Sequence, residues 1–69
     1  MYHVKVFRSD LNRVAHECDV VTREEGMALA REAVHGMGVR NTREFFESIV
    51  GYSHDGREAI HVSVRKIED

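Results

Sequence analysis

His16 and Cys18 are the residues whose types and spacing come closest to a chemical site. In an extended chain, residues two apart share a face, so an imidazole and a thiol would lie side by side. Both groups bind zinc, but a structural site needs four ligands, and no C-x-x-C or H-x-x-x-H pair accompanies them. A Cys18 nucleophile with His16 or His61 as its base is a second possibility. We expect neither, because a single free cysteine usually packs as a small apolar side chain.

The remaining polar residues do not form a recognisable active site either. The chain has five histidines, and His3 and His61 could oppose each other on a sheet and make a pH-sensitive interface. Ordinary solvent-exposed histidines are the simpler expectation. Glu24 and Glu25 are explained by the start of a helix, where the dipole favours negative charge. We therefore predict no catalytic residue, no metal site and no cofactor, and expect that the protein is not an enzyme.

Residues 22–37 have the only clear helical period of the chain. Thr22 can accept a hydrogen bond from a free N–H of the first turn, and Glu25 can reach back to complete a capping box. Gly36 and Gly38 supply the end, because glycine takes the left-handed conformation that helix ends often need. The helix then has one apolar stripe for a partner surface. The stripe consists of Met27, Ala30, Ala33 or Val34, and Met37, with Leu29 beside it.

Residues 2–8 and 14–21 alternate as two β-strands of a hairpin. A three-residue loop, Asp10-Leu11-Asn12, brings their apolar faces together, with Asn12 in the left-handed region. The alternative is a short helix over residues 10–18, capped by Ser9. The strand register places Val6 opposite His16, Val4 opposite Cys18 and Tyr2 opposite Val20.

Residues 44–53 and 58–67 form a second predicted hairpin. Asp55-Gly56 lies between them and favours a type I′ turn, in which both central residues have positive φ. The alternative for residues 43–51 is a short helix that is capped by Thr42 and ended by Gly51.

These elements predict an α+β fold of one domain, residues 1–69, with the order β-β-α-β-β. One helix packs on one face of a four-stranded antiparallel sheet. The strand over residues 44–53 is apolar on both faces, so we place it centrally. With the strands numbered in chain order, their predicted order across the sheet is 2-1-3-4. The residues expected under the helix are Val4, Val6, Val14, Cys18, Phe45, Ile49, Ile60, Val62 and Val64.

The second face of this sheet has no helix to cover it. A contiguous exposed apolar patch often marks an interaction site, so we expect this open face to bind a partner. Its residues are Phe7, Phe46, Val50, Tyr52, His61 and Arg65. The leading hypothesis is a protein-binding module, either a homodimer that self-associates through this face or a binder of another protein. The alternative is a single-stranded nucleic-acid binder, which would use the aromatic rings with Lys5, Arg65 and Arg43.

Composition limits the partners and the compartment. The formal net charge is −2, with 10 basic and 12 acidic residues, which gives no support for DNA or an anionic membrane as partner. One cysteine cannot form an intrachain disulfide, so a reducing, cytoplasmic setting is expected. No apolar run approaches the roughly 18 residues of a membrane span, and no signal-peptide pattern is present.

The join between the second strand and the helix, VVTREEGMALAREAV, resembles a pattern in short uncharacterised proteins of phages and their actinobacterial hosts. The resemblance covers roughly the first 37 residues. It implies a phage-type accessory protein that acts on a host protein, with no active site to carry over.

Overall fold

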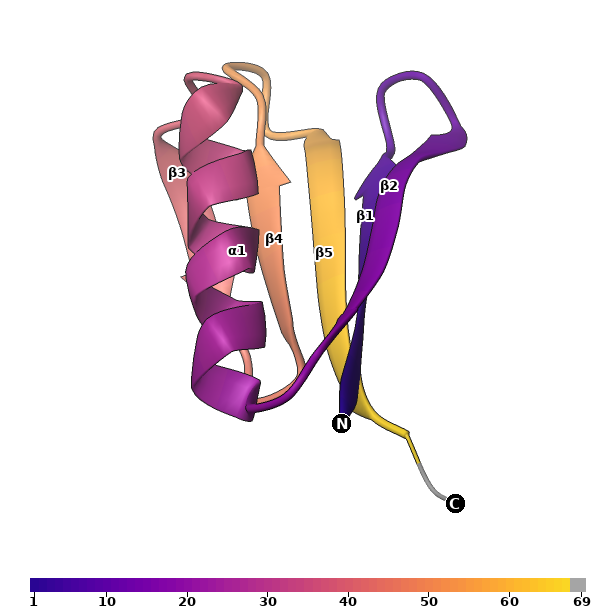
Figure 1. Cartoon of the computed structure of the whole chain (residues 1–69). Helices are drawn as coiled ribbons and strands as arrows, with labels where there is room; N and C mark the ends of the chain where they lie inside the picture. The colour runs from indigo at the N-terminus through magenta and orange to yellow at the C-terminus, as the bar shows by residue number, and fades with distance from the viewer. Residues whose placement is uncertain (68–69) are drawn as a thin grey trace.

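The computed structural model of the chain describes residues 1–67, which form one antiparallel sheet with a single helix against one face (Figure 1). The α+β class and the helix on one face are confirmed. The sheet, however, has five strands rather than four, in the lateral order β2-β1-β5-β4-β3. The elements are β1 (Tyr2–Arg8), β2 (Arg13–Val20), α1 (Arg23–Gly36), β3 (Asn41–Glu44), β4 (Ser48–Tyr52) and β5 (Glu58–Lys66).

The first hairpin follows the predicted register. Val6 pairs with His16, Val4 with Cys18 and Tyr2 with Val20, and Asn12 has a φ of 53°. A bulge between Val6 and Phe7 changes the pairing at the loop end, so that Phe7 lies opposite Val14. Because directly opposed residues share a face, Val14 lies on the open side and is 41% exposed, and its expected place under the helix is wrong.

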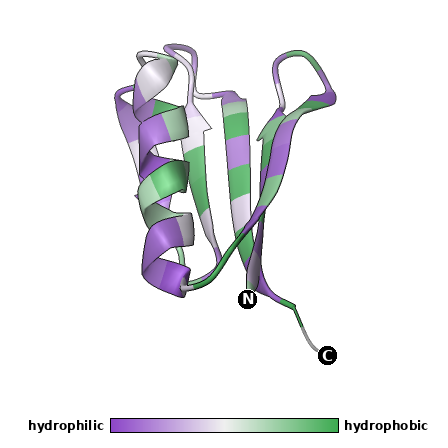
Figure 2. Ribbon diagram, in the orientation of Figure 1, coloured by the Kyte–Doolittle hydropathy of each residue, from purple (hydrophilic) through white to green (hydrophobic). Residues whose placement is uncertain are grey.

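Helix α1 has Thr22 as its N-cap, as predicted, and ends at Gly36. The N–H of Glu25 donates to the Thr22 hydroxyl at 3.2 Å, and Gly38, with a φ of 73°, donates its N–H to the His35 carbonyl at 2.9 Å. Met27, Ala30 and Val34 are buried against the sheet. Figure 2 shows the matching pattern in the sheet, where hydrophobic and hydrophilic residues alternate along β5.

The segment predicted as one strand, residues 44–53, is divided into two strands. Phe45, Phe46 and Glu47 connect β3 to β4, and the N–H of Phe45 donates to the Ser48 carbonyl at 2.7 Å. Phe45 is 51% and Phe46 74% exposed, so the expected burial of Phe45 under the helix is wrong. The alternative of a short helix over residues 43–51 is also excluded by these strands.

The second hairpin turn differs from the predicted type I′ turn. Gly56 has a φ of 83°, whereas Asp55 does not take a positive φ. The N–H of Gly56 donates to the Ser53 carbonyl at 3.0 Å, and the N–H of Ser53 donates to the Arg57 carbonyl at 2.8 Å. The turn therefore centres on His54 and Asp55, and Gly56 takes the left-handed position that follows a type I turn.

β5 lies at the centre of the sheet, between β1 and β4, and not the predicted strand over residues 44–53. Its Ile60, Val62 and Val64 are at most 1% exposed. The helix approaches closely over Gly26, where a Cβ would lie 2.6 Å from Val64 Cγ1. The buried core consists of Val4, Val6, Met27, Ala30, Val34, Ile49, Ile60, Val62 and Val64.

Candidate interaction surfaces

The face of the sheet opposite α1 is open, and the strand register defines its side chains. Phe7 of β1 lies opposite His61 of β5, and Lys5 lies opposite Ser63. Val50 of β4 lies on the other side of His61. Five of the six residues predicted for the interaction face therefore share one side of the sheet. They are Phe7, Val50, Tyr52, His61 and Arg65.

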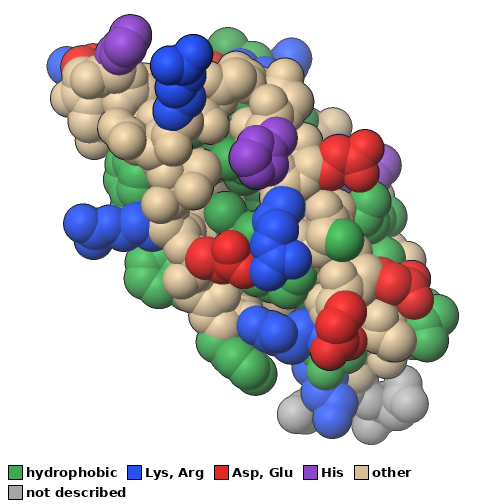
Figure 3. All heavy atoms as spheres, turned by 90° about the vertical axis from the view of Figure 1, so that its left-hand side faces the viewer, with side chains coloured by type: hydrophobic (Ala, Val, Ile, Leu, Met, Phe, Trp, Pro, Cys, Tyr) green, Lys and Arg blue, Asp and Glu red, His purple; other side chains and the backbone are tan. Residues whose placement is uncertain are grey.

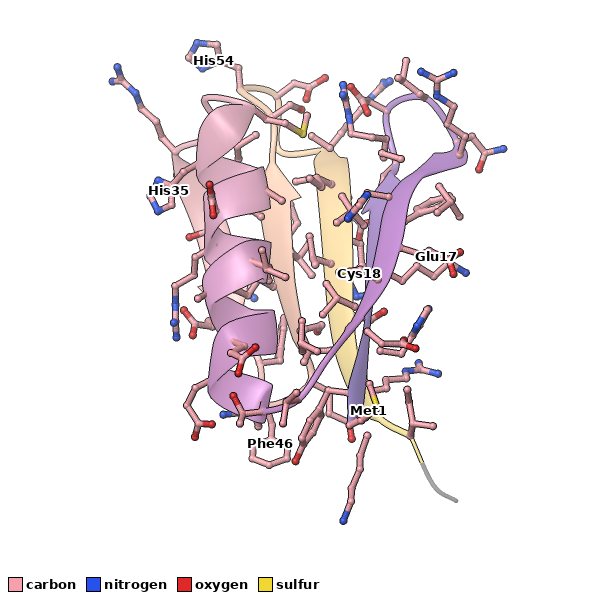
Figure 4. All side chains as sticks on the ribbon, in the orientation of Figure 1. Met1, Glu17, Cys18, His35, Phe46 and His54 are labelled. Carbon is pink, nitrogen blue, oxygen red and sulfur yellow. The ribbon has the colours of Figure 1, made fainter. Side chains whose placement is uncertain are left out.

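Phe46, the sixth predicted residue, lies outside the strands, where α1 begins (Figure 4). The Arg23 guanidinium stacks 4.2 Å from the centre of its ring. Arg23 also donates to the Phe46 carbonyl from Nη2 at 2.7 Å and from Nε at 3.1 Å. Phe46 thus belongs to the contact between the helix start and the β3–β4 connection, and not to the open face.

The open face is less apolar than its sequence predicts and carries charges of both signs, since Lys5 lies opposite Glu17 and Tyr52 lies opposite Glu58. Val50 is only 7% exposed, because the longer side chains of His61 and Arg43 lie opposite it on both neighbouring strands. Two hollows are found beside it. One, of about 240 Å³, is lined by Lys5, Phe7, His61, Ser63 and Arg65. The other, of about 570 Å³, is lined by Arg40, Asn41, Thr42, Arg43, Tyr52 and Gly56. Among the described residues, no carboxylate lines either hollow.

His3 is held between two carboxylates of β2 at the margin of this face. Its Nδ1 lies 2.8 Å from an Asp19 oxygen, and its Nε2 lies 3.0 Å from a Glu17 oxygen. Both ring nitrogens donate only when the imidazole is protonated. The hydrogen bond to Asp19 raises the pKa of His3 above its ordinary value, although partial desolvation opposes the shift.

The pairing of His3 with His61, considered as a possibility from the sequence, does not form. His3 lies opposite Arg65, and His61 lies opposite Phe7. The His3 cluster was missed at the sequence level, although the predicted register of the first hairpin already set His3 opposite Asp19.

His16 and Cys18 lie on the helix side of β2, as expected for the face they share with Val4 and Val6. Within residues 1–67, no group of three or more His, Cys, Asp or Glu side chains is placed to hold a metal ion. Figure 4 shows Cys18 on β2, with α1 on one side and Glu17 on the other. The pair instead forms one wall of an apolar groove.

This groove, which we call the α1–β2 groove, has a volume of about 290 Å³. Its floor is β1 and its walls are β2 and α1. The lining residues are Val4, Val6, His16, Cys18, Leu29, Glu32 and Ala33. Leu29 is 39% exposed, so the apolar stripe of the helix continues beyond the core into the groove.

The flank of the molecule formed by α1 and β3 carries acidic and basic side chains interspersed over its surface (Figure 3). Arg31 of α1 forms an ion pair with Glu44 of β3. This hydrogen-bonded contact lowers the pKa of Glu44. We do not assign this flank a partner.

No protein-family model, curated protein or solved structure matches this chain. No helix among the described residues is long and apolar enough to cross a membrane.

Proposed function

We propose that this protein is a non-enzymatic binding module that recognises an acidic surface of a partner protein through its open sheet face. The observation that carries the proposal is the pair of hollows on either side of Val50. Each combines an aromatic ring, Phe7 or Tyr52, with two cationic side chains and lacks a carboxylate among the described residues. Aromatic residues and arginine are enriched at the centres of protein interfaces, and complementary charge selects the partner.

The small exposed apolar area of this face favours a different protein over a second copy of the chain. Val50, which would supply apolar contact in a face-to-face dimer, is nearly buried within its own sheet. The homodimer expected from the sequence is therefore the weaker form of this proposal.

A single-stranded nucleic acid is the second candidate for the same face. Lys5, Ser63 and Arg65 could hold a phosphate beside the ring of Phe7, and aromatic rings on an open sheet stack with bases. The net charge of −2 counts against this reading, because nucleic-acid binding rests on an excess of positive charge.

The resemblance of residues 20–34 to phage accessory proteins makes the partner a host protein in this proposal. The phage-type role and the cytoplasmic setting both stay predictions from the sequence.

The test is affinity capture with the tagged full chain from an actinobacterial lysate, with and without nuclease. The hollow variant, which alters the hollow beside Phe7, combines Lys5→Glu with Arg65→Glu. Its matched control is Arg13→Glu with Arg57→Glu, which changes the net charge equally but lies outside both hollows. We expect a protein that is captured by the wild type and the control, is lost with the hollow variant, and survives nuclease.

Equal capture by all three forms, or no capture, would refute the proposed face. Loss of the captured material on nuclease treatment would put the nucleic-acid reading first. Far-UV circular dichroism of each variant confirms that the fold is retained.

A further inference from the structure

β2 is the longer of the two edge strands of the sheet. It has eight residues, whereas β3 at the other edge has four. Only β1 lies beside β2, so among the described residues one side of its backbone has no strand partner. Such an edge presents a row of N–H and C=O groups that can pair with another extended chain. Most of its residues are exposed, which leaves this edge accessible.

The α1–β2 groove runs beside this edge. Cys18 and His16 of β2 form one wall and Leu29 and Ala33 of α1 form the other, above Val6 and Val4 of β1. Its volume of about 290 Å³ lies at the lower limit of the roughly 300–1,000 Å³ typical of small-molecule pockets. The space suits a few side chains of a peptide better than a drug-sized ligand. Strand addition beside a groove that takes alternate side chains is an established way to bind a peptide.

The charges around the groove indicate the chemistry of that peptide. On the helix, Glu25 and Glu32 stand four residues before and three residues after Leu29, so all three share one side of α1. Glu32 itself lines the groove. On the other face of β2, Glu17 and Asp19 lie next to each other on one side of the strand. A strand added here would meet carboxylates on both of its faces.

The same carboxylates oppose pairing of β2 with a second copy of itself. An antiparallel self-pairing centred on Glu17 places Glu17 opposite Glu17. One centred on Cys18 places Glu17 opposite Asp19. Like charges directly opposite each other destabilise a strand pair. A partner strand with basic residues avoids this repulsion and complements the acidic rims.

We infer that the β2 edge and the α1–β2 groove accept an extended segment of another protein in which apolar and basic side chains alternate. Its backbone pairs with the unpartnered side of β2. Its apolar side chains enter the groove against Leu29 and Cys18, and its basic side chains, which point to the opposite face, reach Glu17 and Asp19. The β2 edge and the groove lie apart from the two hollows of the open face, and Glu17 and Asp19 project on the side of that face. The inference does not depend on the partner proposed for the hollows.

The probe is a synthetic peptide that alternates valine and lysine over about eight residues, to match the eight residues of β2. A second peptide has the same composition with its valines and lysines in separate blocks. Cys18 is the one cysteine of the chain and lies on the groove wall, so its rate of modification by a thiol reagent reports occupancy. At ten times its Kd, we expect the alternating peptide to slow this rate by about tenfold, because only unbound protein reacts.

Two variants of the full chain make the test specific. Leu29→Lys places a cation in the groove and should abolish the protection. Leu11→Lys makes the same change at another exposed leucine, 50% exposed in the β1–β2 loop, and should leave the protection intact. Both variants alter exposed positions, and circular dichroism checks their folding.

Three results would overturn the inference: no protection of Cys18 at millimolar peptide, equal protection by the block peptide, or protection that survives Leu29→Lys. Amide chemical shifts add an independent readout. Changes along β2 support strand addition, whereas changes confined to β1 and β5 around Phe7 place the peptide on the open face and refute it.

Discussion

Gly26 and Gly36 belong to the same helix, and yet we expect opposite effects when each is replaced by alanine. A Cβ at Gly26 would lie 2.6 Å from Val64 Cγ1 and 3.3 Å from Val4 Cγ2, whereas a Cβ at Gly36 would meet nothing within 4 Å. Val64 is 1% exposed. Its branched side chain has few alternative rotamers, so it cannot move aside without disturbing the core.

The magnitudes decide the sign of each change. Alanine in place of glycine in a helix gains up to about 1 kcal/mol. Overpacking a filled core costs about 1–3 kcal/mol, and a 2.6 Å approach puts Gly26→Ala in the upper part of that range. The net effect is a loss of about 1 kcal/mol for Gly26→Ala and a gain of about 0.5 kcal/mol for Gly36→Ala. In a domain of this size, 1 kcal/mol corresponds to a change of about 4–8 °C in Tm.

Thermal and urea unfolding, followed by far-UV circular dichroism, measure both variants. A third variant, Gly26→Ala with Val64→Ala, removes the atom that a Cβ at position 26 would meet. Its two changes should therefore be less damaging together than the sum of their separate effects, by at least about 0.5 kcal/mol. If Gly26→Ala raises Tm as much as Gly36→Ala does, the helix does not approach the sheet as closely as the 2.6 Å distance between a Cβ at position 26 and Val64 Cγ1 requires.

Three further substitutions test other contacts. Gly51→Ala should destabilise the fold by about 1–2 kcal/mol, since its Cβ would lie 2.8 Å from Ile60 Cγ2; an unchanged urea midpoint would contradict this. Because the pKa of His3 is raised above 6.5 in the folded protein, its contribution to stability is present below that pH and is lost as the pH rises through the folded-state pKa. His3→Gln should therefore lower Tm more at about pH 5.5 than at about pH 8.5, and a pH-independent difference would refute the role of the carboxylates. Thr22→Ala removes the N-cap acceptor of the Glu25 N–H and should cost about 1 kcal/mol; unchanged hydrogen exchange at that amide would count against it.

The local features of the fold could be predicted because short-range chemistry determines them. Thr22 caps the helix through a bond within one turn. Asn12 takes the left-handed position that a three-residue loop requires, and this loop sets the register of the whole β1–β2 hairpin. The placement of Val4, Val6 and Cys18 on the helix side followed from that register.

The features that were predicted wrongly depend on contacts distant in sequence. Phe45 and Phe46 have the composition of a central strand, but they lie in an exposed connection, where Phe46 contacts Arg23 of the helix. The polar side chains of β5, among them His61 and Ser63, suggested a strand outside the centre. An antiparallel sheet with one open face can nevertheless hold such a strand centrally, because its polar side chains face water. The bulge that turns Val14 to the open side has no sequence signal of its own.

The lateral strand order also determines the chemistry of the open face. With the strand of Val50 beside β1, as the sequence predicts, Phe7 would have joined an apolar patch suited to a second copy of the chain. With β5 between them, Phe7 lies opposite His61 and Lys5 lies opposite Ser63. Arg65 is two residues after Ser63 and lies on the same side of β5. The apolar patch is thereby replaced by a cationic hollow. The carboxylates Glu17 and Asp19 stay at the β2 margin, where they hold His3. These two carboxylates therefore share the open side with Lys5, and they form the boundary between the cationic hollow and the β2 edge.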